Sequence, residues 1–121
     1  MDSSTNNKRK YQRFYGKGTL PGKLLLEENN HQVIQHSEVI NVSQRGIGIL
    51  TEQPLSKGTR LILKIEGRPP VNLEIVFCYQ ELGHSKLIYN VGLFARSENI
   101  SITKLLASYG IVINEKIGEA G

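Results

Sequence analysis

The sequence predicts a mainly β protein, a six-stranded antiparallel barrel followed by one C-terminal helix. Three observations lead to this fold class. Several short apolar runs alternate apolar and polar residues, which is typical of antiparallel strands with one buried face. One late segment has apolar residues at helical spacing instead. So many short strands in 121 residues would leave exposed edges, which closure into a barrel removes.

The size and composition indicate one soluble domain. Hydrophobic residues make up 39% of the chain and charged residues 21%, which is ordinary for a globular protein. No run approaches the roughly 20 apolar residues of a membrane span, and the N-terminus lacks the apolar core of a signal peptide. Cys78 is the single cysteine, so no internal disulfide forms, which fits a reducing compartment. We therefore expect a cytoplasmic protein.

The N-terminal quarter holds all of the excess positive charge. Residues 1–26 contain six lysines and arginines and one aspartate, so their net charge is +5. The other residues carry −1, which gives the total of +4. This distribution indicates a basic arm on a nearly neutral body, since a general polyanion binder would spread its charge over a face. We expect residues 1–8 to be a flexible polar tail, 9–113 the domain and 114–121 a C-terminal tail.

The strands are expected in chain order after the turn residues Gly16, Gly18, Pro21 and Gly22. The six apolar runs are 22–28, 33–43, 45–50, 59–66, 70–80 and 86–95. Alternation places Leu61, Leu63 and Ile65 on one face of the fourth run. In the fifth run it places Phe77 and Tyr79 on the same face as Leu73 and Ile75, with Cys78 opposite them.

A helix is predicted within residues 97–111. Ile102, Leu105, Leu106 and Tyr109 have helical spacing, and Asn99 or Ser101 is available as the N-cap. Gly110 stands where a glycine ends a helix. The helix would cover one end or flank of the barrel.

The sequence contains no catalytic or metal-binding pattern that can be argued. His31, His36 and His84 are scattered, and none is paired with Cys78 or a carboxylate at metal-ligand spacing. No basic neighbour is available to lower the pKa of Cys78, so we interpret it as a small packing residue. We therefore expect no enzyme and no metal.

Two short motifs carry the functional prediction. Arg9-Lys-Tyr-Gln-Arg13 offers two permanent charges with planar donor forks that match phosphate and the O6/N7 edge of guanine. In Asn41-Val-Ser-Gln-Arg-Gly46, alternation puts Asn41 and Ser43 on one strand face, where they offer donors and acceptors for a base edge. Gly46 permits a bulge or a close approach of the backbone to a ligand. Taken alone, the first motif is also compatible with a solvated basic tail and the second with a polar strand end.

The order and spacing of the two motifs resemble the PilZ domain family over roughly residues 9–110, and residues 89–95 look like its late strand. The resemblance implies a PilZ-type, split-barrel-like fold and a non-catalytic receptor for the bacterial second messenger cyclic di-GMP. The motif arginines would be Arg9 and Arg13, which bind guanines and phosphates. Asn41 and Ser43 would read a guanine, and Gly46 would allow close approach.

Other basic residues extend this predicted site. Arg45, in the variable part of the second motif, is expected to add a phosphate contact because of its charge. Lys8 and Lys10 flank the arginines and are expected to influence whether one nucleotide or a stacked pair binds. A standalone domain must act through a protein partner, which the sequence does not name.

Two alternatives remain open at this point. One is a small basic β-barrel that binds RNA or single-stranded DNA through its arm. The other is a PilZ-like adaptor that has lost nucleotide binding and contacts only proteins.

Overall fold

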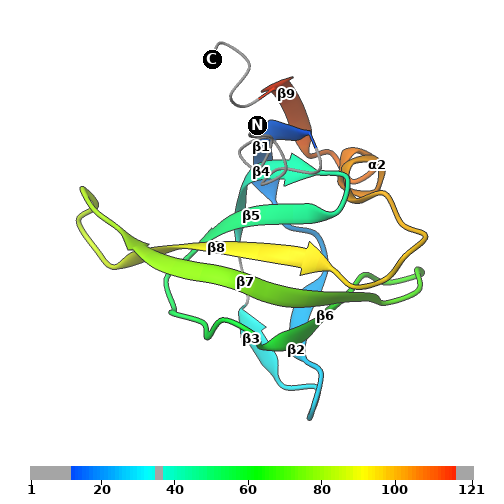
Figure 1. The fold of residues 1–121 in the computed structure, drawn as a ribbon, viewed down its shortest axis with the longest axis horizontal. Helices are drawn as coiled ribbons and strands as arrows, with labels where there is room; N and C mark the ends of the chain where they lie inside the picture. Colours follow the sequence, from blue (N-terminus) through cyan, green and yellow to red (C-terminus); the bar gives the residue numbers. More distant parts are fainter. Residues whose placement is uncertain (1–11, 35–36, 117–121) are drawn as a thin grey trace, which may run out of the picture.

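The fold is an antiparallel sheet that curls around an apolar core, with one short helix packed near one end (Figure 1). This computed structural model describes residues 12–34 and 37–116. The strands are β1 (Arg13–Thr19), β2 (Lys23–Leu26), β3 (Gln32–Ile34), β4 (Glu38–Ser43), β5 (Gly46–Thr51), β6 (Arg60–Lys64), β7 (Val71–Glu81), β8 (Ile88–Ala95) and β9 (Val112–Lys116). The helix α2 (Ile102–Ala107) lies between β8 and β9.

The strand order corrects part of the predicted architecture. The mainly β class with a late helix is confirmed, but the described residues form nine strands in one sheet, in the order β3-β2-β6-β7-β8-β5-β4-β1-β9. Within these residues no ladder joins β3 to β9, so the predicted six-stranded closed barrel is not found. Gly22, with φ of 77°, introduces a break between β1 and β2. A further strand, β9, runs through the predicted domain boundary at residue 113.

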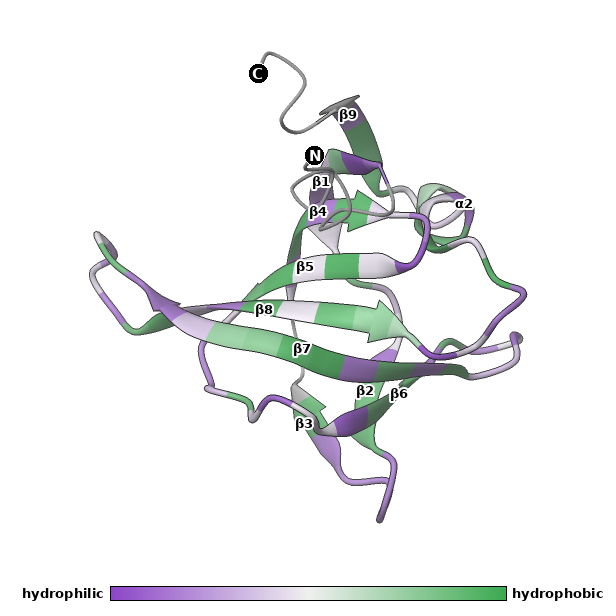
Figure 2. Ribbon diagram, viewed as in Figure 1, coloured by the Kyte–Doolittle hydropathy of each residue, from purple (hydrophilic) through white to green (hydrophobic). Residues whose placement is uncertain are grey.

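The core follows the predicted alternation in most strands. Leu61, Leu63 and Ile65 are buried on one face of the segment that contains β6, as expected. They pack with buried residues of β4, β5 and β8 and with the apolar face of α2. Figure 2 shows the same division, with apolar residues along the strands and most hydrophilic colour in the connecting loops.

A β-bulge in β7 overturns the predicted orientation of its second half. The register with β8 shifts between Ile75 and Phe77, so that one extra residue, Val76, lies between them. Because side chains alternate along a strand, this insertion turns Phe77 and Tyr79 to the outer face and Cys78 to the core. Cys78 packs against the core, and its Sγ accepts a hydrogen bond from the backbone N–H of Leu55 at 3.4 Å. The expected packing role of Cys78 is confirmed, but on the opposite face.

The helix is shorter than predicted and has the expected caps. Ser101 is the N-cap, and its Oγ accepts a hydrogen bond from Lys104 N. At the other end Gly110 has φ of 89°, and Ile111 N and Gly110 N donate to the carbonyls of Leu106 and Ala107. This pattern is a Schellman motif, in which a left-handed glycine ends the helix. No helix in the described ranges is long and apolar enough to cross a membrane.

Candidate functional site

The two sequence motifs meet on the outer face of the sheet, where β1 pairs with β4. Arg13 lies opposite Ser43, and Tyr15 lies opposite Asn41. One guanidinium nitrogen of Arg13, Nη2, donates a hydrogen bond of 2.8 Å to Asn41 Oδ1. The structure therefore brings together one arginine of the first motif and the amide of the second.

A second bulge directs Asn41 to this face. Val39 and Val42 are both buried although they are three residues apart, and the register of β4 with β5 shifts between Val39 and Asn41. Asn41 and Ser43 consequently lie on one face of the strand, as alternation predicted, and that face is the outer one. Bulges are frequent beside functional sites because they redirect individual side chains.

Two glycines of β5 form the floor under these polar groups. A Cβ added to Gly48 would lie 2.5 Å from both Nδ2 and Oδ1 of Asn41. A Cβ added to Gly46 would lie 3.1 Å from Ser43 Oγ. The Asn41 amide therefore rests on Gly48 and the Ser43 hydroxyl beside Gly46. Sequence reasoning missed Gly48, although its place two residues after Gly46 on one strand face was a usable signal.

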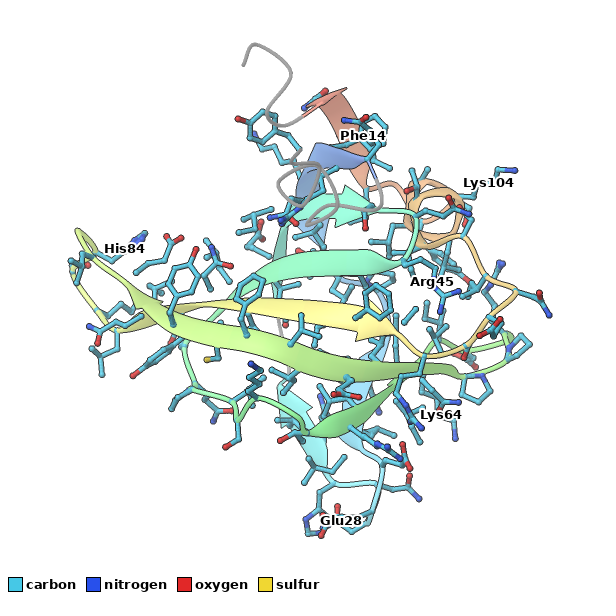
Figure 3. All side chains as sticks on the ribbon, in the orientation of Figure 1. Phe14, Glu28, Arg45, Lys64, His84 and Lys104 are labelled. Carbon is cyan, nitrogen blue, oxygen red and sulfur yellow. The ribbon has the colours of Figure 1, made fainter. Side chains whose placement is uncertain are left out.

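Arg45, labelled in Figure 3, donates hydrogen bonds to backbone carbonyls at and just after the end of β8. Its Nη1 donates to the carbonyl of Glu98 at 3.0 Å and its Nη2 to that of Ala95 at 2.6 Å. The guanidinium also lies 5.5 Å from the centroid of the Phe94 ring, a cation–π distance. Arg45 therefore ties the turn of the second motif to the segment before α2.

The turn of the second motif also contacts α2 directly. The first helical N–H, that of Ile102, donates to the carbonyl of Gln44 at 2.8 Å. Together with the Arg45 contacts, this bond joins the Ser43–Gly46 turn to residues 95–102. The turn and the first residue of the helix are therefore directly hydrogen-bonded.

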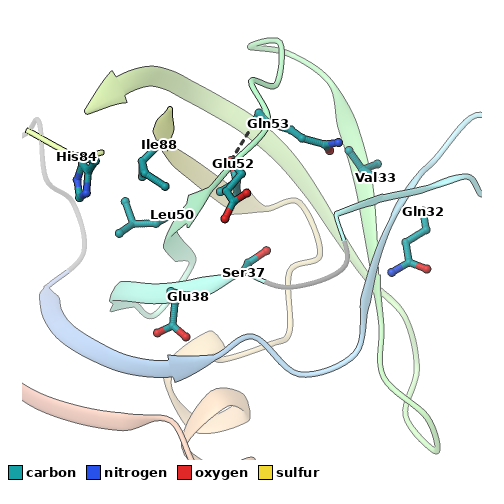
Figure 4. A pocket seen from close by; sticks show the side chains of 10 residues that line it. Gln32, Val33, Ser37, Glu38, Leu50, Glu52, Gln53, His84 and Ile88 are labelled. Carbon is teal, nitrogen blue, oxygen red and sulfur yellow. Dashed lines mark hydrogen bonds between the residues drawn. The ribbon is translucent and has the colours of Figure 1, made fainter. Parts of the chain in front are cut away.

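A hollow elsewhere on the molecule has the wrong electrostatics for an anion. It is lined by ten residues that include Glu38, Glu52, His84 and Ile88 (Figure 4). Glu52 already pairs with Lys86 at 2.9 Å. Nearby, a hydrogen bond from Asn90 and then the contact with His84 hold the pKa of Glu81 below its usual value. Ionised carboxylates at this end would repel phosphate, so the site formed by Arg13, Asn41 and Ser43 is the better anion site.

The structure does not describe three of the predicted site residues. Lys8, Arg9 and Lys10 lie outside the described residues. Within residues 12–34 and 37–116, no three His, Cys, Asp or Glu side chains are grouped so that they could hold a metal ion.

Comparison with known proteins gave one match. The family model described as the PilZ domain matches residues 7–103, which include both motifs, the sheet from β1 to β8 and the first residues of α2. No curated protein and no solved structure matches the chain.

Proposed function

The chain belongs to the PilZ domain family, and on this basis we propose that it is a bacterial, cytoplasmic, non-catalytic receptor for cyclic di-GMP. The observation that carries the proposal is the hydrogen bond between Arg13 and Asn41. It joins the two motifs on the outer sheet face, where a cation and a base-reading amide would be able to reach the same ligand.

The ligand chemistry matches this combination of groups. Cyclic di-GMP has two phosphate charges and two guanines, so its receptor needs fixed cations together with base-edge partners. Arg13 supplies the cation at the edge of the site, and Asn41 and Ser43 supply polar groups for a guanine edge. Gly46 has no side chain and so leaves room for the ligand beside Ser43. Arg9 completes the clamp from the N-terminal arm, and Lys8 and Lys10 add charge that favours the dianion.

We assign Arg45 a supporting role in place of the phosphate contact expected from its charge. The carbonyls of Ala95 and Glu98 already use a donor of each terminal nitrogen of its guanidinium, at 2.6 and 3.0 Å. Its contacts instead fix the turn that presents Ser43 and Gly46.

The proposed signal is a change in the surface that a protein partner meets. When the dianion binds, the arm containing Arg9 would be drawn onto the sheet at a cost in chain entropy. The bond from Ile102 to Gln44 and the Arg45 contacts would then transmit a movement of the Ser43–Gly46 turn to α2. An effector protein would recognise the ordered arm together with this part of the molecule.

Calorimetric titration with cyclic di-GMP tests the proposal. Wild type should bind, and Arg9→Ala and Arg13→Ala should each weaken binding about tenfold or more, because hydrogen bonds to charged groups contribute ~1.5–3 kcal/mol. Arg60→Ala is the matched control, since Arg60 is an exposed arginine of β6 outside the site. Absence of binding by wild type, or equal binding by all four proteins, would contradict the proposal.

A nucleic-acid function is the second candidate, and the outward Phe77 and Tyr79 are the observation that favours it. Exposed aromatic residues on a sheet are the usual stacking surface for single strands. Glu74 and Glu81 lie on the same outer face of β7, however, and would repel a continuous phosphate backbone. A gel shift with single-stranded RNA and DNA decides between the two functions: salt-sensitive binding that cyclic di-GMP does not displace would favour this candidate.

A further inference from the structure

Phe77 and Tyr79 form an aromatic pair on the face that carries the candidate site. Their ring centroids are 5.6 Å apart with an interplanar angle of 21°. Tyr79 is 54% exposed, and Phe77 is partly exposed. Packing of the core does not require these rings, because the bulge at Val76 turns them away from it.

A row of directly opposed residues connects this pair to Asn41. Across β4, β5, β8 and β7, Asn41 lies opposite Gly48, Gly48 opposite Gly92, and Gly92 opposite Phe77. Directly opposed residues point to the same face of a sheet. The row therefore runs from a polar amide to an aromatic ring over two adjacent glycines.

The two side chains at the ends of this row incline toward each other. The Asn41 amide covers Gly48. The Phe77 ring covers Gly92, where an added Cβ would overlap three ring atoms, Cδ2, Cε2 and Cζ. The ring therefore fills the space that a side chain at position 92 would need. The glycine pair thus lets a hydrogen-bonding group and a flat aromatic surface approach over two neighbouring strands.

We propose that Phe77 and Tyr79 are the stacking platform for one guanine base of the bound nucleotide, while Arg13, Asn41 and Ser43 hold the other base and the phosphates. This inference rests on the proposed function. The two guanines belong to one closed dinucleotide, so they must bind within a few strands of each other, and the row supplies two base sites at that separation.

The charges of the outer face support this division of the ligand. Glu74 and Glu81 flank the platform on β7, and Arg13 lies at the far side of the row. Carboxylates repel phosphates but tolerate a neutral base, whose amino and imino hydrogens they attract. The phosphates are therefore directed toward β1 and the arm, and a base toward β7.

Titration of full-length variants with cyclic di-GMP tests the platform. Phe77→Leu and Tyr79→Leu should each weaken binding roughly 5- to 100-fold, as expected for the loss of one base–aromatic contact. Phe77→Tyr and Tyr79→Phe keep an aromatic ring and should bind like wild type. Tyr109→Leu is the matched control, because Tyr109 is a partly exposed aromatic residue that contacts Arg68 beyond the end of α2.

A spectroscopic readout separates stacking from a structural role. The chain has five tyrosines and no tryptophan, so nucleotide binding should quench part of the tyrosine fluorescence. Tyr15 lies opposite Asn41 and contributes its own share, so Tyr79→Phe should lose the share of the quenching that comes from Tyr79 while it still binds. If Phe77→Leu fails to fold, Tyr79→Leu still decides, because Tyr79 is largely exposed. Wild-type binding with unchanged affinity in the leucine variants overturns the platform alone. No wild-type binding overturns the proposed function itself.

Discussion

At the scale of single residues, the candidate site depends on the absence of a side chain at Gly48. The Asn41 amide lies 2.5 Å from the position that a Cβ of residue 48 would take, and its Oδ1 there accepts the hydrogen bond from Arg13. Asn41 and Arg13 are 28 residues apart in sequence, so the contact exists only in the folded sheet. The geometry of the candidate site is therefore sensitive to a single methyl group.

We expect Gly48→Ala to weaken cyclic di-GMP binding about tenfold with little loss of stability. The new Cβ would lie 2.5 Å from the Asn41 amide atoms, which must move away and give up the Arg13 bond. The displaced group is the end of a flexible side chain, and alanine removes chain entropy that glycine retains when unfolded, so the melting temperature should change little. Calorimetric titration and thermal melting measure the two effects.

A double-mutant cycle controls this prediction. If Gly48→Ala acts through Asn41 alone, it should cost nothing further when Asn41 is already alanine. If Gly48→Ala instead lowered the affinity for cyclic di-GMP by the same factor in the wild-type protein and in Asn41→Ala, the methyl group would block the ligand directly.

At the scale of secondary-structure elements, the short helix depends on its C-terminal glycine. α2 has six residues, too few to be stable without packing and caps. Gly110 has φ of 89°, and an added Cβ would meet nothing within 4 Å. The cost of a side chain at this position is therefore a backbone cost alone.

We expect Gly110→Ala to destabilise the fold by ~1–2 kcal/mol, the cost of a left-handed conformation for a residue with a Cβ. Gly110→Asn should cost less, because asparagine tolerates this conformation. Urea denaturation followed by circular dichroism measures both, with the midpoint falling and the slope unchanged. Equal midpoints for the glycine and alanine proteins would contradict the expected strain.

The elements also show why part of the fold could be predicted from the sequence and part could not. Strict alternation identified β6 and its buried face, and Ser101 and Gly110 marked the helix ends. The bulge at Val76 was not predictable, since apolar residues continue on both sides of it and no glycine or proline marks it. It reverses the faces of Phe77, Cys78 and Tyr79.

The ninth strand was missed for a different physical reason. β9 is held by its ladder with β1, which is a long-range pairing, and its own sequence alternates only briefly before charged residues begin. The contacts of Arg45 could not be predicted from the sequence either. Its charge suggested a phosphate contact, which stays a prediction, whereas the structure shows its hydrogen bonds to the carbonyls of Ala95 and Glu98, about 50 residues away in sequence. Local patterns cannot report such tertiary partners.

At the scale of the whole molecule, charge is divided between the arm and the body. Residues 1–26 carry +5 and the rest of the chain −1. If the proposed function holds, the excess positive charge of this N-terminal segment would attract the dianion, and the acidic residues of β7 would disfavour its phosphates on their side of the sheet. The electrostatic part of binding would then be open to screening by salt.

We expect cyclic di-GMP affinity to fall roughly 3- to 10-fold as KCl rises from about 0.05 to 0.5 M, because exposed ion pairs contribute ~0.2–1 kcal/mol each and are screened by salt. Removing charges of the arm with Lys8→Gln and Lys10→Gln should lower the affinity at low salt and flatten its salt dependence. The matched control is Lys57→Gln with Lys64→Gln, which removes the same charge from exposed positions of the body and should leave the slope as in wild type. If the two double variants had the same slope, the attraction would come from net charge, and the arm would have no special part in capturing the nucleotide.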